Sequence, residues 1–350
     1  MSHSLTPPEA ICVVRLSAIG DTCHALAVVR NLQDNWPGCR ITWIIGKTES
    51  TLLADIPGVE FIIFDKSKGR AAYDDVRTGL QGKSFDVALC MHASMRVNRI
   101  NRMIPAPVRL GFDWKRARDL QWLSTNKRIP HVAGEHALDA MMGFARFIGA
   151  DAKPMRWDIP LSDDDRAFAE RYCKHPTLVI SPCSSQRSRN FRNWSVDNYV
   201  AVAKHAQNRH GCRVVVTGGP TDLERDYGAA IVEKTGGNVV NLVGETTLKQ
   251  LLAVLAESDV LVCPDSGPAH MATAVKTPVV GLYATTNPGR TGPYVSRKLT
   301  VNRYPDALEK FMGKTVEQVR WGQRVRHPDA MDLITVDDVT GKIDMVFGSP

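Results

Sequence analysis

The stretch richest in side chains that could do chemistry runs from Asp259 to Val275 and reads DVLVCPDSGPAHMATAV. Between two apolar runs it gathers an acid, a hydroxyl, a glycine and a histidine into one turn, namely Asp265, Ser266, Gly267 and His270. A helix beginning here would present unpaired N–H groups and a positive dipole end, which favour an anion such as phosphate. Because Asp265 would repel a phosphate directly, it either accepts a hydrogen bond from a nearby hydroxyl or amide or only caps the helix.

A second polar turn follows the apolar run AICVVRL, in the stretch RLSAIGDTCHAL. It carries Ser17, and Asp21 would open a helix with His24 one turn further on the same face. The turn has one of the three glycines that a dinucleotide fingerprint needs, which counts against an NAD enzyme. Asp21 could be a general base or only an N-cap, and a histidine placed like His24 is more often a partly buried residue than a catalytic one.

Hydroxyls and arginines gather in a third stretch, SPCSSQRSRNFRNWSVDNY. Guanidinium groups beside hydroxyls at the end of a strand suit a diphosphate, because arginine offers paired donors and stays charged. These residues are Ser184, Ser185, Arg187, Arg189 and Arg192. A solvated basic loop is the competing interpretation. In a fourth turn, TGGPTDLERD, Asp222 or Glu224 could accept hydrogen bonds from a ribose or only favour the helix dipole.

The elements that must position these turns alternate between strands and helices. In the first half we expect strands at 10–16, 40–45, 61–64 and 85–90, and helices at 21–33, 72–80 and 136–148. After a connector at 154–160 the pattern restarts, with strands at 177–181, 212–217, 239–242, 260–263 and 278–283, and helices at 163–174, 194–207, 222–234 and 248–257. This repetition predicts an α/β fold with two doubly wound, mostly parallel sheets and a cleft between them.

The bulk properties agree with two globular domains. The chain has 350 residues, of which 43% are apolar and 23% charged. We expect domains at 1–157 and 158–325, and a tail at 326–350 that could pack back on either half, the N-terminal domain included. No targeting signal or run of about 18 apolar residues is visible. Eight scattered cysteines without a CxxC pair favour free thiols in a reducing cytosol.

No sequence pattern supports a metal or a cofactor. The chain has no HExxH motif, EF-hand loop or cysteine cluster, and the acidic run 163–165 opens a helix, where acids stabilise the first turn. The net charge of +7 and the pI near 9.0 favour an acidic partner, which could be nucleic acid, an anionic lipid surface or a phosphorylated substrate. Bases concentrate between Arg96 and Arg128, where a solvated surface is the ordinary interpretation.

Several of these stretches resemble glycosyltransferase family 9, the ADP-heptose:lipopolysaccharide heptosyltransferases. The resemblance is carried by RLSAIGDTCHAL, the SS…RNW loop and above all DSGPAHMATAVKTPVVGLYATTNPGRTGPY, with support from FDVALCMHASMR, RLGF and HALDAMMGFARFIGA. It implies the GT-B fold, with two Rossmann-like domains facing across a cleft, the first binding the acceptor and the second the nucleotide sugar. The implied reaction is an inverting, metal-independent transfer of L-glycero-D-manno-heptose from ADP-heptose to the Kdo/heptose inner core on lipid A.

By this resemblance Asp21 would be the general base, and Arg192 would take part in catalysis. The resemblance implies donor contacts from Ser184, Ser185, Arg192, Asp222, Asp265, Ser266, Gly267 and His270. Expected acceptor contacts are Ser17, His24, Arg96, Arg99, Arg102 and Lys115. Three departures stand out: Arg192 replaces a common lysine, the longer loop leaves Arg187 or Arg189 as substitutes for it, and Ala27 replaces a proline after the base.

The resemblance also implies partners and a location. Kdo carboxylates and lipid A phosphates would match the basic segment, which could also draw the enzyme to the anionic inner membrane. We therefore expect a cytoplasmic enzyme that is peripheral on the inner membrane, with no cofactor and no nucleic-acid partner. The alternatives are a related transferase that uses another nucleotide sugar and a non-catalytic nucleotide-binding module.

Overall fold

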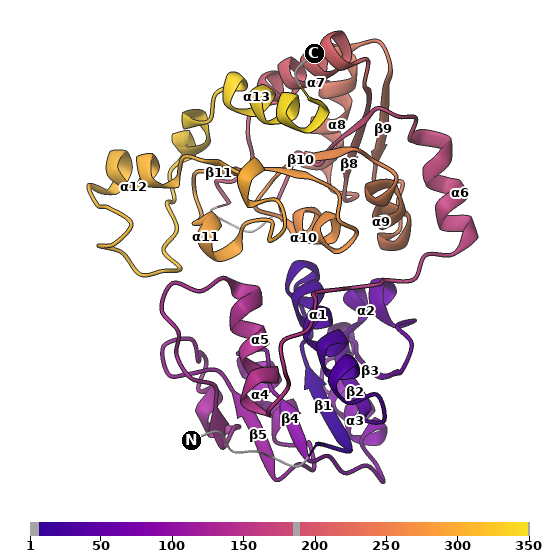
Figure 1. Ribbon diagram of the computed structural model, residues 1–350, viewed down its shortest axis with the longest axis vertical. Helices are drawn as coiled ribbons and strands as arrows, with labels where there is room; N and C mark the ends of the chain where they lie inside the picture. The colour runs from indigo at the N-terminus through magenta and orange to yellow at the C-terminus, as the bar shows by residue number, and fades with distance from the viewer. Residues whose placement is uncertain (1–6, 185–189, 349–350) are drawn as a thin grey trace. The chain divides into compact units, whose positions relative to one another are not determined.

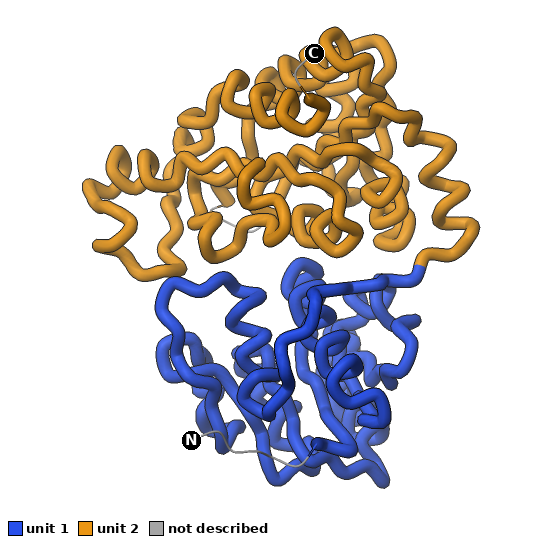
Figure 2. Tube along the Cα trace, in the orientation of Figure 1, with its two compact units in different colours: residues 1–160 blue, residues 161–350 orange. Residues whose placement is uncertain are grey.

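The computed structural model describes residues 7–184 and 190–348. The chain divides into two compact units, Met1–Pro160 and Leu161–Pro350, which Figure 2 shows in different colours. Each unit contains one sheet of six strands, and every strand pair in both sheets is parallel (Figure 1). The α/β fold expected from the alternating pattern is confirmed.

The first unit is built on the strand order β3-β2-β1-β4-β5-β6. Its strands are β1 (Ala10–Val14), β2 (Arg40–Gly46), β3 (Val59–Phe64), β4 (Val87–Leu89), β5 (Val108–Gly111) and β6 (Lys127–Arg128). Its α-helices are α1 (Ile19–Asn35), α2 (Lys47–Leu53), α3 (Ala71–Gly79), α4 (Met95–Asn101) and α5 (Ala137–Phe147). All residues of β1 are buried, as expected for a central strand of a parallel sheet that is covered on both faces.

The second unit repeats this plan with the order β12-β11-β10-β7-β8-β9. Its strands are β7 (Thr177–Ile180), β8 (Arg213–Gly218), β9 (Val239–Val243), β10 (Val260–Pro264), β11 (Val279–Tyr283) and β12 (Val301–Asn302). Its α-helices are α6 (Asp163–Tyr172), α7 (Val196–His210), α8 (Asp222–Thr235), α9 (Leu248–Ala256), α10 (Gly267–Ala274), α11 (Pro288–Thr291), α12 (Tyr304–Met312) and α13 (Val336–Phe347).

Each sheet has one point where the direction of winding reverses. Counted along its own unit, each sheet has the order 3-2-1-4-5-6, so β1 lies beside β4 in the first unit and β7 lies beside β10 in the second. The loops that follow these strands diverge to opposite faces of the sheet and leave a crevice at the carboxyl ends, where open α/β sheets bind ligands. Three of the polar turns found in the sequence follow β1, β7 and β10.

The helices that begin right after β1 and β10 have no side-chain cap. The N-cap of α1 is Ala18 and that of α10 is Ser266, and neither side chain accepts a hydrogen bond from its helix. By contrast, α7 and α8 are capped by the hydroxyls of Ser195 and Thr221. The first N–H groups of α1 and α10 are therefore not satisfied by their own caps and can serve a ligand.

The C-terminal tail belongs to the second unit. Helix α13 packs on α7 and also contacts β11 and β12. Val339 and Ile343 of α13 are fully buried in the hydrophobic core of that unit. Of the two halves on which the tail was expected to pack, it is the second whose core α13 joins, with its apolar face covered by α7.

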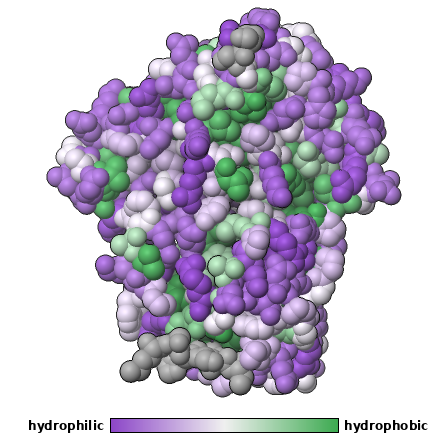
Figure 3. Space-filling model, in the orientation of Figure 1, coloured by the Kyte–Doolittle hydropathy of each residue, from purple (hydrophilic) through white to green (hydrophobic). Residues whose placement is uncertain are grey.

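The surface and the cysteines are those of a protein that buries its apolar side chains in one core per unit. Hydrophilic residues dominate the face shown in Figure 3, where apolar residues form separate patches. Among the described residues, no helix is both long and apolar enough to span a membrane. The eight cysteines are free thiols, as the scattered spacing predicts.

Candidate functional site

The turn after β10 has the local structure that its sequence predicts. Asp265 directly follows the buried strand and is itself 8% exposed. Ser266 is the N-cap of α10 and Pro268 lies in its first turn, where the missing N–H costs nothing. Asp265 is therefore not the cap of this helix. Its carboxylate lies instead 3.4 Å from Nη1 of Arg192, which also donates to the backbone oxygen of Asp265 at 2.9 Å.

Arg192 reaches Asp265 from the loop after β7, so the structure brings together two of the turns that the sequence singled out. Its Nε donates to Oδ1 of Asn190 at 3.2 Å. Ser184 is 2% exposed, and its hydroxyl also donates to Oδ1 of Asn190, at 3.0 Å. Asn193 accepts from the backbone N–H of Ser184 at 2.9 Å. Sequence reasoning missed both asparagines, although they flank Arg192 in the run RNFRNW.

Two buried aromatic residues fix this loop to the core. The indole of Trp194 is fully buried and donates to the backbone oxygen of Ile334 at 3.1 Å. The hydroxyl of Tyr199 donates to the backbone oxygen of Pro182 at 3.1 Å, and the two rings meet edge to face at 5.3 Å. Arg192 thus lies two residues before Trp194, whose buried indole anchors the loop to the core. Ser185, Arg187 and Arg189 lie outside the described residues.

The remaining donor candidates lie at the starts of α8 and α10. His270, 8% exposed, follows Gly267 by one turn of α10. Asp222 is exposed in the first turn of α8. The carboxylate of Glu224 accepts from the N–H of Gly219 at 2.8 Å and from the hydroxyl of Thr221 at 2.6 Å. Glu224 therefore stabilises its own turn, which leaves Asp222 as the better candidate for a ribose contact.

In the first unit, the structure decides against one of the two interpretations of Asp21. It occupies the first turn of α1, but the N-cap is Ala18, so Asp21 does not cap the helix. Its carboxylate forms an ion pair with the guanidinium of Arg15, and its side chain remains 40% exposed. Arg15 also donates to the backbone oxygen of Met91 at 2.6 Å. Asp21 is thus oriented by a half-buried arginine while its carboxylate stays accessible.

His92 was not among the sequence candidates, although it lies in the stretch FDVALCMHASMR. Its Nδ1 accepts from the backbone N–H of Leu16 at 3.4 Å. Burial, together with the positive charge of Arg15, lowers the pKa of His92 to about 4. The imidazole is therefore neutral at pH 7 and adds no positive charge beside Asp21.

The expected acceptor residues do not form a single group. His24 is 3% exposed and packs against His136, with ring centroids 5.6 Å apart, which favours a packing role. Ser17 is half-buried in the turn before α1. Arg96 and Arg99 are exposed on α4, Arg102 follows as its C-cap, and Lys115 is exposed after β5. Arg99 lies 5.9 Å above the ring of Tyr73, and Arg102 donates to the backbone oxygen of Leu123 at 3.4 Å.

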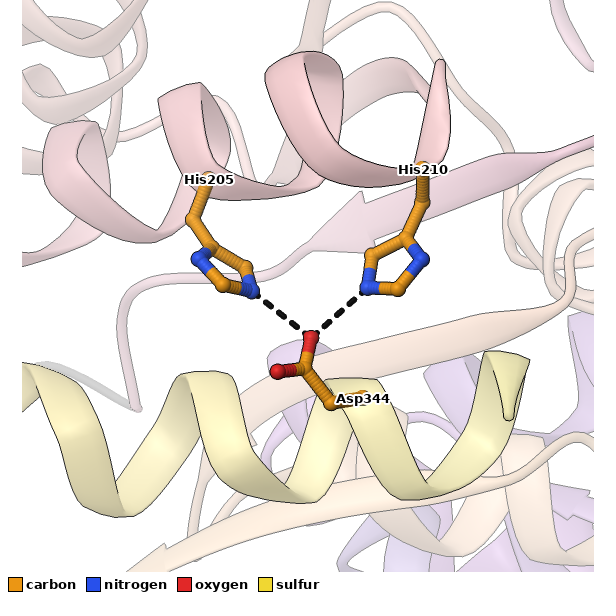
Figure 4. Close-up of side chains that lie close together, drawn as sticks. All are labelled: His205, His210 and Asp344. Carbon is orange, nitrogen blue, oxygen red and sulfur yellow. Dashed lines mark hydrogen bonds and ion pairs between the residues drawn. The ribbon is translucent and has the colours of Figure 1, made fainter. Parts of the chain in front are cut away.

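Among the described residues, one group of side chains is close enough to hold a metal ion: His205, His210 and Asp344 (Figure 4). Both Nε2 atoms lie 2.7 Å from the same oxygen of Asp344, and Nε of Arg209 lies 3.4 Å from the other oxygen. Burial opposes ionisation of Asp344, but the hydrogen bonds to the two histidines outweigh it and lower the pKa of the carboxyl. These bonds join α7 to α13 and account for all three side chains without an ion.

Comparison with known proteins identifies the family. The family model described as glycosyltransferase family 9 (heptosyltransferase) matches residues 75–319. The chain is 37% identical over 338 residues to the lipopolysaccharide core heptosyltransferase OpsX of Haemophilus influenzae, with 96% of each chain covered. The chain belongs to glycosyltransferase family 9. The resemblance carried mainly by three of the polar turns is thus confirmed, and the protein is a glycosyltransferase.

Solved structures of the family support the fold. The glycosyl transferase family 9 structure from Veillonella parvula superposes with a TM-score of 0.77 at 20% identity, over 97% of each chain. The E. coli heptosyltransferase WaaC with ADP superposes with a TM-score of 0.73 at 18% identity, over 96% of this chain and 99% of that one. The GT-B architecture of two Rossmann-like units, predicted from the resemblance, is confirmed.

Proposed function

We propose that this heptosyltransferase moves L-glycero-D-manno-heptose from ADP-heptose to the Kdo/heptose inner core on lipid A. Family membership and the similarity to a lipopolysaccharide core heptosyltransferase support this reaction class. The observation that carries the donor assignment is the contact of Arg192 with Asp265 at the winding reversal of the second sheet. An arginine, a buried acid and an uncapped helix N-terminus meet there, and together they suit a sugar nucleotide with its diphosphate.

In the proposed mechanism, Asp21 accepts the proton of the acceptor hydroxyl as the oxygen attacks the anomeric carbon of heptose. The bond from that carbon to the diphosphate oxygen breaks on the opposite side, so the configuration inverts and ADP leaves. Arg192 and the first N–H groups of α10 stabilise the negative charge that grows on the diphosphate. The reaction needs no change of oxidation state and no cofactor.

The other donor residues have distinct tasks in this proposal. Asp265 holds the guanidinium of Arg192 and can accept from a hydroxyl of the ligand, and Asp222 accepts from the ribose. Ser266, Gly267 and His270 line the turn where the diphosphate approaches the helix. Ser184 supports Asn190, which also holds Arg192. Ser185 is assigned to the donor by the family resemblance.

The acceptor and the membrane are proposed to share the basic surface around α4. Arg96, Arg99, Arg102 and Lys115 carry charges that match Kdo carboxylates, lipid A phosphates and an anionic inner leaflet. Trp114 and Leu123 are 63% and 58% exposed in the same part of the first unit. Large exposed apolar side chains among bases are typical of a surface that meets lipid. We therefore propose a peripheral enzyme on the cytoplasmic face of the inner membrane.

Donor choice separates this function from its nearest alternative, a transferase for another nucleotide sugar. Isothermal titration calorimetry of the full chain with ADP-heptose, UDP-glucose and UDP-N-acetylglucosamine would measure it. We expect saturable binding of ADP-heptose and no heat from either UDP-sugar. Tighter binding of a UDP-sugar would overturn the donor assignment, and binding of ADP-heptose without transfer to any lipid A core acceptor would favour a non-catalytic binding module.

A further inference from the structure

A hollow opens beside Asp265 in the second unit. Its other walls come from two segments that were not predicted to bind anything. Thr286 and Arg290 come from the region of α11, and Trp321 and Arg324 from the stretch after α12. The hollow is partly open to solvent and too small to enclose a whole nucleotide sugar, so it can take only part of such a ligand.

The charges around the hollow are mostly positive. Arg290 and Arg324 line it, and Arg192 holds Asp265 at its edge. Partial burial, together with the nearby charges of Arg192 and Arg290, lowers the pKa of Arg324. Arginines gathered around one acid repel one another unless an anion joins them. This arrangement excludes a cation and favours an anionic oxygen group.

Thr286 points to the same kind of ligand by a separate observation. Its side chain is 6% exposed and lines the hollow, yet its Oγ1 has no hydrogen-bond partner among the described residues. A buried hydroxyl without a partner costs free energy unless a ligand or water completes it. A phosphate oxygen would accept the hydroxyl hydrogen and would be drawn by the two arginines.

The walls of the hollow are fixed by contacts that do not involve a ligand. The backbone N–H of Val325 donates to the backbone oxygen of Thr285 at 2.9 Å, which ties the Arg324 segment to the end of β11. The hydroxyl of Tyr304 donates to the backbone oxygen of Gln323 at 3.0 Å. A Cβ at Gly289 would lie 3.0 Å from the ring of Trp321, so the two segments touch. The hollow is thus preorganised.

We propose that this hollow binds a phosphate group of the donor diphosphate, with Thr286 donating a hydrogen bond and Arg290 and Arg324 balancing its charge. The inference rests on the proposed ADP-heptose function. It adds a second group of diphosphate contacts to the one already assigned to Arg192. Acceptor phosphates and carboxylates have the same chemistry, but the hollow adjoins Asp265 in the nucleotide turn, which favours the donor. Arg324 and Thr286 would then act on ADP affinity.

Calorimetry on the full chain tests this with ADP and with adenosine, which lacks phosphate. We expect Arg324→Gln and Thr286→Val each to weaken ADP binding by roughly 10- to 150-fold, since each removes one hydrogen bond to a charged group. Adenosine binding should stay unchanged in both variants. Arg320→Gln is the matched control, because Arg320 is exposed in the same segment and does not line the hollow. Thermal unfolding of each variant shows whether the fold is intact.

The remaining outcomes each overturn a different statement. If adenosine binding weakens as much as ADP binding, the hollow holds the nucleoside and the phosphate assignment is wrong. If ADP binding is unchanged in both variants while the KM for the lipid A acceptor rises, the anion comes from the acceptor. If the wild type binds neither ADP nor ADP-heptose, the proposed function itself fails.

Discussion

Arg15 and Asp21 form an ion pair that connects the end of β1 to the first turn of α1. Arg15 is itself held by the backbone oxygen of Met91, beyond β4. The two strands that lie beside each other at the winding reversal of the first sheet therefore jointly orient the carboxylate that we assign as the base. A proton acceptor must be held in one direction and still be reachable, and Asp21 meets both conditions.

Replacing Asp21 by asparagine keeps the shape of the side chain and removes its ability to take a proton. We expect kcat for heptose transfer to fall by roughly 10²- to 10⁴-fold, the usual contribution of a general base, while ADP affinity is unchanged. Asp74→Asn is the control, because it also breaks a carboxylate–arginine pair, the exposed one with Arg77 on α3. Normal turnover in the Asp21 variant would refute the assignment.

Arg15 is a positioning residue in this account, because it acts through Asp21. Arg15→Gln should lower kcat by about tenfold with little change in the KM for the donor, and Arg15→Lys should recover part of the loss because the charge returns. Steady-state kinetics with both variants measures this. A purely structural role would instead lower the unfolding temperature and leave kcat per folded molecule unchanged, and the lysine variant would then rescue stability alone.

Arg192 donates through two different nitrogens, to Asn190 and to Asp265, which a lysine cannot reproduce from one ammonium group. We therefore expect Arg192→Lys to raise the KM for ADP-heptose by about tenfold, and Arg192→Gln to raise it further. Initial rates over a donor series provide the test. If Arg192→Lys behaves as wild type and Arg189→Gln does not, Arg189 is the diphosphate contact.

The link between α7 and α13 should make the second unit sensitive to acid. The pKa of Asp344 is lower in the folded protein than in an unfolded chain, so its ionised form contributes stability above about pH 4, and this is lost as the pH falls through the folded pKa. Chemical unfolding between pH 3 and pH 7 should show a smaller pH dependence for Asp344→Asn than for the wild type. The same pH dependence in the wild type and in Asp344→Asn would contradict a stabilising link through Asp344. A rise in unfolding temperature with added Zn²⁺ would mean that an ion joins α7 and α13.

The basic surface around α4 should bind anionic vesicles. Replacing Arg99 and Arg102 together by glutamine should weaken sedimentation with phosphatidylserine-containing vesicles by roughly tenfold or more, because each base near an anionic surface contributes about 1 kcal/mol. Raising the salt concentration should weaken wild-type binding in the same direction. Vesicles of phosphatidylcholine alone are the control, and equal binding to both kinds would show that charge does not drive association.

Much of the fold was predictable because its central strands are apolar on both faces and end at recognisable turns. Strand β10 was expected at 260–263 and spans Val260–Pro264, and a helix was expected to begin in the turn that follows, where α10 begins at Gly267. Most of the elements that the sequence did not reveal are short, among them α2, α4, β6 and β12, whereas α12 was missed although it has nine residues. Elements of two to seven residues show too few repeats of their period to stand out from loops.

The site was less predictable than the fold, for physical reasons. Asp265, Arg192 and Asp21 were candidates from the sequence because polar residues after a buried strand mark the carboxyl edge of a sheet. Thr286 and Arg324 were not candidates, because only the folded chain brings the end of β11 beside the stretch after α12. His24 was expected near the acceptor, but its position on α1 faces the interior and His136. The sequence shows helical spacing without showing which face is covered.

The most direct test of the central claim is incubation of the purified protein with ADP-heptose and Kdo-lipid A, with and without a chelator, followed by mass spectrometry and NMR of the product. The account predicts that one heptose is added, that its anomeric configuration is inverted relative to the donor, and that the chelator does not change the rate. Retention of configuration, or loss of transfer when the chelator is present, would contradict it.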